Sequence, residues 1–225
     1  MNWNHWEQNW YEKTSEHLMS HVALAKEVHD FVEHVATHEQ IMLPPTTESR
    51  SVERILLRRL GEEYRSLELL AVRGHGFQAM SACANLFELA HMVGHIVNDD
   101  AEAARWLASN NRDRLPWSIK TLVTNNGRKI GWDAARVDEE YGRYGFLCGF
   151  KHNNPVFTRV LTLPGDADLY LAQFALAEGA HLALVAVGLV VFFRFEGEQC
   201  STVLARSNDL FARAAVAIPS LDRFQ

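Results

Sequence analysis

The segment from Gly179 to Phe193 is almost wholly apolar, and it limits what the chain can fold into more than any other segment. A transmembrane helix needs about 20 such residues. Here His181 interrupts the segment, Glu178 precedes it and Arg194 follows it. We therefore expect a buried core helix over 166–195, and we expect no membrane partner.

Composition and charge limit the class of protein. The chain has 225 residues, of which 48% are hydrophobic and 22% charged, and this balance excludes a disordered or collagen-like chain. Three scattered cysteines exclude a disulfide framework, and the N-terminal residues do not form a secretory signal, so we expect a cytoplasmic protein. The net charge of -6 does not support nucleic-acid binding.

Apolar residues recur with a helical period elsewhere in the chain, and no segment shows the alternation of a β-strand. Pro44-Pro45 and Leu163-Pro164-Gly165 are expected helix breaks. Asp99-Asp100-Ala101-Glu102 has the pattern of a capping box, with Asp99 as the cap and Glu102 reaching back, and Asp166 is expected to cap the long apolar helix. The predicted helices span 3–41, 49–72, 77–97, 100–109, 116–127, 133–152, 166–195 and 201–217. The sequence therefore predicts an all-α fold, a bundle of four long helices with an N-terminal helical arm and a short-helix insertion.

The predicted arm covers 1–45 and the predicted bundle domain covers 46–225. Residues 1–50 contain three Lys or Arg and eight Asp or Glu, so this end of the chain is acidic. Trp3, Trp6 and Trp10 follow one side of the first helix, where they favour a packing contact. We expect a homo-oligomer, most simply a dimer, formed through this arm.

Two copies of the motif Glu-x-x-His lie in the most apolar helices. Glu88 with His91 and Glu178 with His181 each fall on one helical face. A buried charge needs a partner, a metal ion or a shifted pKa. Bundles with carboxylate-bridged di-iron or di-manganese centres use two such motifs and one further Glu from each of two other helices.

Glu63 and Glu140 are the candidates for the two further carboxylates. Glu63 and Glu88 lie at similar distances in sequence from the turn at His75, so an antiparallel hairpin would bring them to one level. Glu140 lies as far before the helix end at His152 as Glu178 lies after the helix start at Asp166, so these two could also meet. A di-iron or di-manganese site is one hypothesis. The hypothesis that we prefer is a structural network in which Glu88 and Glu178 bind His, Tyr or Arg side chains.

The segment from Tyr144 to His152 contains a second set of candidate residues. Tyr144, Cys148 and His152 are spaced i, i+4, i+8 and share roughly one helical face. His152 and Tyr144 are therefore candidate catalytic residues, with His152 as an acid or base near Glu88 or Glu178. The alternative is that His152 only ends the helix before Asn153-Asn154-Pro155.

The motif Tyr-x-x-Leu-Cys-x-x-x-His, from Tyr144 to His152, together with Phe87-Glu88, resembles a group of bacterial all-helical proteins loosely similar to the HEPN-like superfamily. The resemblance covers roughly 55–195. It implies a helical bundle, a dimer and a link to RNA cleavage or phage defence. Active HEPN ribonucleases carry Arg-x(4–6)-His, whereas eight residues separate Arg143 from His152, so the resemblance does not extend to that chemistry.

Three functions follow from these observations. The first is a soluble binding or regulatory module whose buried polar residues are structural. The second is a di-metal carboxylate protein. The third is an RNA-acting or phage-defence protein, which a basic groove formed by Arg143 and Lys151 around His152 would support. We rank the first highest because it requires no ligand.

Overall fold

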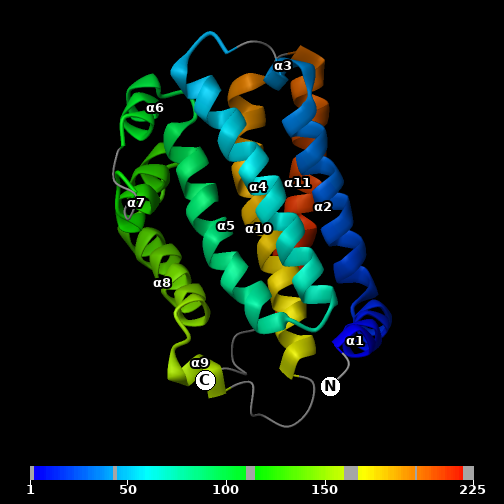
Figure 1. Ribbon diagram of the computed structural model, residues 1–225. Helices are drawn as coiled ribbons and strands as arrows, with labels where there is room; N and C mark the ends of the chain where they lie inside the picture. Colours follow the sequence, from blue (N-terminus) through cyan, green and yellow to red (C-terminus); the bar gives the residue numbers. More distant parts are fainter. Residues whose placement is uncertain (1–2, 43–44, 110–114, 160–166, 196, 220–225) are drawn as a thin grey trace.

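The computed structural model shows an all-α protein, which confirms the predicted fold class (Figure 1). It describes residues 3–42, 45–109, 115–159, 167–195 and 197–219. The long helices are α1 (Trp3–His17), α2 (Met19–Thr37), α4 (Glu48–Val72), α5 (Gly76–Ile96), α8 (Ala134–Lys151), α10 (Ala167–Arg194) and α11 (Gly197–Ala217). The short helices are α3 (Glu39–Met42), α6 (Asp100–Leu107), α7 (Ile119–Lys129) and α9 (Pro155–Thr158).

α10 is the central helix of the bundle, and it packs against α5, α4, α2 and α11. By length and composition this helix could cross a membrane, but 67% of its most apolar 18-residue window is buried inside the protein. A helix that is apolar around its whole circumference needs neighbours on every side. The packing therefore agrees with the interpretation of this segment as a core helix.

α5 is the second helix with little exposed surface, and it lies between α4 and α8 (Figure 1). It follows α4 through a tight turn in which Gly74 has φ of 83°, a conformation that favours glycine. The turn makes α4 and α5 an antiparallel hairpin, as the sequence predicts. Glu63 of α4 and Glu88 of α5 accordingly lie on the two helices of this hairpin.

The N-terminal segment is not the single continuous helix that the sequence predicts over 3–41. The expected continuous helix is interrupted at Leu18, which has φ of -117° and ψ of 28°, and again at His38. α2 packs against α4 and α10, and its inner face is buried in the same apolar core as theirs. The buried side chains of this face are Leu24, Ala25, Val28, Phe31, Val32 and Val35. α1 packs against α2 and α4, and its Glu7 lies 3.2 Å from His75, so the division into an arm and a bundle domain stays a prediction.

Side-chain caps explain where several helices begin. The backbone N–H of Glu102 donates to Asp99 at 3.1 Å, which confirms the predicted cap. The second half of the predicted capping box is wrong, because the Glu102 carboxylate accepts from Trp117 Nε1 at 2.8 Å and the backbone N–H of Asp99 donates to Ile96. Asp133 caps α8 in the same way, accepting from the N–H of Arg136 at 2.8 Å. The predicted cap at Asp166 and the break at 163–165 lie outside the described residues.

In the short-helix insertion, α7 ends later than the sequence predicts. The sequence Asn125-Asn126-Gly127 is typical of a helix terminus, but α7 continues to Lys129. The reason is tertiary: the Asn126 side chain is buried and donates to the backbone oxygen of His91 at 2.8 Å. Lys129 then donates to the last carbonyl groups of α5, at Gly94 (3.0 Å) and His95 (2.8 Å).

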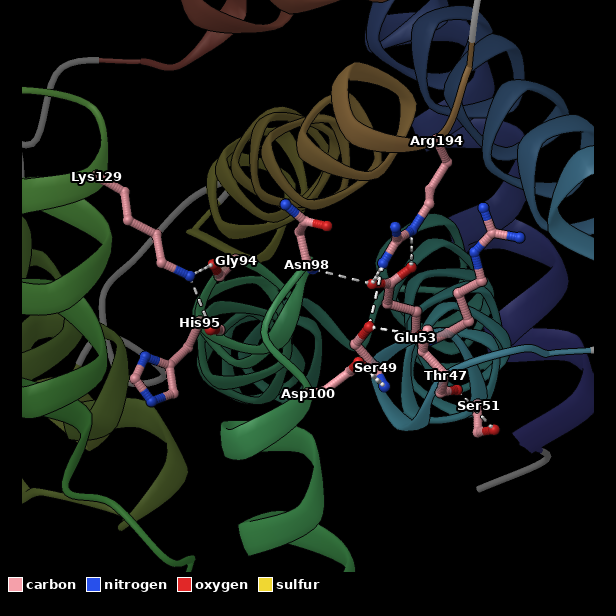
Figure 2. A network of polar contacts seen from close by, with 11 residues as sticks. Thr47, Ser49, Ser51, Glu53, Gly94, His95, Asn98, Asp100, Lys129 and Arg194 are labelled. Atoms are coloured by element: carbon pink, nitrogen blue, oxygen red, sulfur yellow. Dashed lines mark hydrogen bonds and ion pairs between the residues drawn. The ribbon is translucent and has the colours of Figure 1, made fainter.

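A buried polar network fixes the beginning of α4 against the end of α10 (Figure 2). Arg194 Nε and Nη2 donate to the two Glu53 oxygens at 2.8 and 2.5 Å. The same carboxylate accepts from the N–H of Asn98, and the N–H of Ser49 donates to Asp100 at 2.9 Å. Both charged side chains of the central pair are almost completely buried. The network positions α4, which forms one wall of the groove described below.

Candidate functional site

The buried charges of the bundle converge on Arg143 of α8. Its guanidinium forms an ion pair with Glu178 of α10 and lies 3.7 Å from Glu140 on its own helix. Glu178 is fully buried and Glu140 is 6% exposed. Glu140 and Glu178 thus both contact Arg143, which is the cation between them, although α8 packs against α5 and α7 and does not form the predicted hairpin pair with α10.

His91 and Asn126 extend this cluster into α5 and α7. His91 Nε2 lies 3.5 Å from Glu140 Oε1, and Asn126 Nδ2 lies 3.1 Å from His91 Nδ1. The imidazole of His91 is 5% exposed, so these contacts replace water around it. Four helices are therefore joined by one chain of contacts that runs from Asn126 to Glu178.

Burial and neighbouring charge oppose each other at the two carboxylates. Burial raises the pKa of Glu178 above its ordinary value, although Arg143 acts in the opposite direction. Burial also disfavours ionisation of Glu140, but the contact with His91 and the charge of Arg143 outweigh it, and the pKa of Glu140 is lowered. A guanidinium shared by two carboxylates thus leaves them in different electrostatic environments.

His181 does not join a metal-ligating group. Its ring packs against Phe211 of α11 with centroids 4.6 Å apart. Burial, together with the positive charge of Arg143, lowers the pKa of His181 to about 4. The imidazole is consequently neutral at physiological pH.

Glu63 bonds to side chains other than those predicted. Asn85 Nδ2 donates to Glu63 Oε1 at 2.8 Å, and Arg59 Nη2 donates to its other oxygen at 3.1 Å. In the described part of the chain, no three His, Cys, Asp or Glu side chains are placed to hold a metal ion. The predicted ligands Glu63, Glu88, His91, Glu140, Glu178 and His181 are therefore not gathered into one centre. The physical reason is that Arg143 occupies the position between carboxylates that a cation would take.

Glu88 has the partners that a structural network predicts. Tyr144 donates to Glu88 Oε1 at 2.8 Å and Lys151 donates to the same oxygen at 2.7 Å. Burial and hydrogen bonding with Cys148 and Glu88 raise the pKa of Tyr144 well above its ordinary value. His152 is exposed and is the C-cap residue of α8, so Lys151 and not His152 reaches the carboxylate.

A groove between α2 and α4 is a site that the sequence interpretation missed. Its volume is about 910 Å³, which lies within the range of about 300–1,000 Å³ typical of small-molecule sites. Val32 and Leu57 contribute buried apolar surface, and Ile55 is 50% exposed along it. A methyl group added at Gly61 would have Val32 Cγ1 as its closest neighbour, at 3.8 Å, so the missing side chain leaves space.

Charged residues line the same groove. Arg54, Arg58 and Arg65 come from α4, whereas Glu33 comes from α2 and Glu62 from α4. Arginines at i and i+4 could have been noticed on the polar face of the predicted helix. The groove itself could not, because it depends on the distance between α2 and α4.

Comparison with protein-family models, curated proteins and solved structures finds no match for this chain. The resemblance to the HEPN-like superfamily therefore stays a hypothesis.

Proposed function

We propose that this chain is a binding module whose ligand site is the groove between α2 and α4. The observation that carries the proposal is the groove itself, with a volume of about 910 Å³ and a lining of apolar and charged side chains. Binding sites for small molecules combine an apolar surface with a few polar groups that orient the ligand. The groove has this composition, and it opens between two helices that the core holds in place.

The buried polar clusters support a structural role for the other candidate residues. Arg143 is neutralised by Glu178 and Glu140, and Lys151 is neutralised by Glu88. Cations that are paired in this way do not supply a basic surface around His152. The arrangement thus favours a binding module over an RNA-acting protein.

Neither of the other two functions has a comparable observation in its favour. Three of the candidate metal ligands, Glu63, Glu88 and Glu178, are bonded to arginine, lysine, tyrosine and amide side chains. The cytoplasmic location and the homodimer stay predictions from the sequence.

Filling the groove tests the proposal. Gly61→Leu places a side chain in the groove at a helical position where a methyl group meets no close contact. The control is Gly142→Leu, which adds the same side chain on an exposed part of α8 where nothing lies within 4 Å. The probe is the neutral fluorophore N-phenyl-1-naphthylamine, titrated into each protein.

We expect saturable binding by the unmodified chain and by Gly142→Leu. Gly61→Leu should weaken binding by about tenfold or more, which corresponds to about 1.4 kcal/mol. Equal affinity in all three proteins, or the absence of saturable binding to the unmodified chain, would contradict the proposal. Circular dichroism and a thermal melt establish that both variants are folded.

A further inference from the structure

The three arginines of the groove differ in their partners. Arg58 Nε donates to Glu62 at 3.1 Å, and Arg65 Nη1 donates to Glu68 at 2.6 Å. Within the described ranges, no hydrogen bond or ion pair joins the guanidinium of Arg54 to another side chain. Two of the arginines are thus paired with carboxylates of α4. The guanidinium of Arg54 has no such partner among the described side chains, so it is available to a ligand.

Arg54 is placed where that charge is effective. The residue is half-buried, so part of it already packs against the protein. It precedes Ile55, which presents half of its surface along the same groove. A guanidinium beside apolar surface favours a carboxylate, because the pair forms charge-assisted hydrogen bonds.

The other charges of the groove limit how much negative charge a ligand can carry. Glu33 and Glu62 line the groove and are 69% and 54% exposed. Glu62 is paired with Arg58, so Glu33 is the carboxylate that repels a polyanion, whereas a single acidic group can approach Arg54. The apolar side chains Val32, Ala36 and Leu57 provide the surface for the remainder of the molecule.

From this combination we propose that the groove binds amphipathic monocarboxylates, with Arg54 binding the carboxylate and the apolar walls binding the hydrocarbon part. The inference rests on the proposed function, because it assigns a ligand class to the same groove. Each buried methylene group of such a ligand adds to its affinity, so chain length as well as charge determines how tightly it binds.

Calorimetric titration with three ten-carbon probes separates charge from apolar contact. The probes are decanoate, 1-decanol and decyltrimethylammonium, each kept below its aggregation concentration. We expect decanoate to bind more tightly than 1-decanol, and decyltrimethylammonium to bind most weakly. Arg54→Gln should weaken decanoate binding by about tenfold and leave 1-decanol binding unchanged.

Arg50→Gln is the matched control. Arg50 lies one helical turn before Arg54 on α4 and does not line the groove, so its replacement removes the same charge outside the site. Decanoate should bind to this variant as it does to the unmodified chain. An equal loss in both variants would mean that only the overall charge matters, and it would refute the role of Arg54.

The outcomes distinguish this inference from the proposed function. If decanoate and 1-decanol bind equally and Arg54→Gln changes neither, the ligand class is wrong while the groove remains a binding site. If Gly61→Leu leaves the binding of both probes unchanged, the groove is not the site and both proposals fail. Uptake of many probe molecules per chain without saturation also overturns the inference.

Discussion

Arg143 reaches across from α8 to the carboxylate of Glu178, which has no exposed surface in the middle of α10. The pair joins α8 and α10, and Glu178 is a charged residue within an otherwise apolar segment of α10. Desolvation of two charges is costly, and their attraction offsets this cost only while both partners are present. Several expected results depend on this relationship and on similar pairs.

Removal of the arginine should destabilise the protein strongly. Arg143→Met leaves Glu178 buried without its cation, and we expect a loss of about 3–5 kcal/mol in the free energy of unfolding at pH 7. The double variant Arg143→Met/Glu178→Gln should recover part of the loss, because no unpaired charge remains. Urea unfolding of the three proteins measures both effects, and a double variant no more stable than the single one would contradict this explanation.

The same variant should respond to pH. The pKa of Glu178 is raised in the folded protein, so the folded state binds its proton more tightly than the unfolded state does. The stability contribution of the protonated carboxyl is present below the unfolded pKa and is lost as pH rises through the folded pKa. Without Arg143 this dependence becomes steeper. As the pH is lowered from 7 to 5, Arg143→Met should therefore gain stability relative to the unmodified chain. A difference in the free energy of unfolding between the two proteins that stays constant over this pH range would contradict the prediction.

His181 should contribute in the opposite direction. Its pKa is lowered from 6.5 to about 4, so its contribution to stability is present above pH 6.5 and is lost as pH falls toward 4. At pH 5 the expected loss from this residue is about 2 kcal/mol. His181→Asn should therefore lose less stability than the unmodified chain between pH 7.5 and pH 5. An NMR titration that gave His181 a pKa near 6.5 would contradict the prediction directly.

The Glu53–Arg194 pair should matter more than an exposed pair of the same chemistry. Glu53→Ala leaves a nearly buried guanidinium unpaired, and we expect a loss of about 3–5 kcal/mol. Glu139→Ala breaks the exposed pair with Arg136 and should cost less than about 1 kcal/mol. Guanidinium-chloride unfolding compares the two, and similar losses would show that burial is not the deciding factor.

Two helical glycines should respond oppositely to alanine. At Gly61 the added methyl group has space, so Gly61→Ala should stabilise the protein by up to about 1 kcal/mol through higher helix propensity. At Gly94 it would lie 2.9 Å from Asn126 Nδ2 and from Leu189 Cδ1, and overpacking should cost about 1–3 kcal/mol. Melting temperatures that shift in the same direction for both variants would contradict this difference.

The predictions made from the sequence were correct for some residues and wrong for others. The apolar periods predicted the helices around Leu60, Leu86 and Leu184, and the predicted cap at Asp99 and the predicted helix start at Asp133 agree with the starts of α6 and α8. The motif Glu178-Gly-Ala-His181 correctly indicated a buried charge. The same motif suggested a metal site, because spacing along one helix cannot show that Arg143 of another helix supplies the cation.

The sequence by itself determined the all-α class, the central position of the most apolar helix and the need of Glu88 and Glu178 for partners, because these depend on local periodicity and on the cost of burying charge. Only the tertiary structure decided which residues are those partners, that α2 belongs to the core, and that α2 and α4 leave a groove at Gly61. These features depend on distances between helices far apart in sequence, and side-chain packing sets those distances.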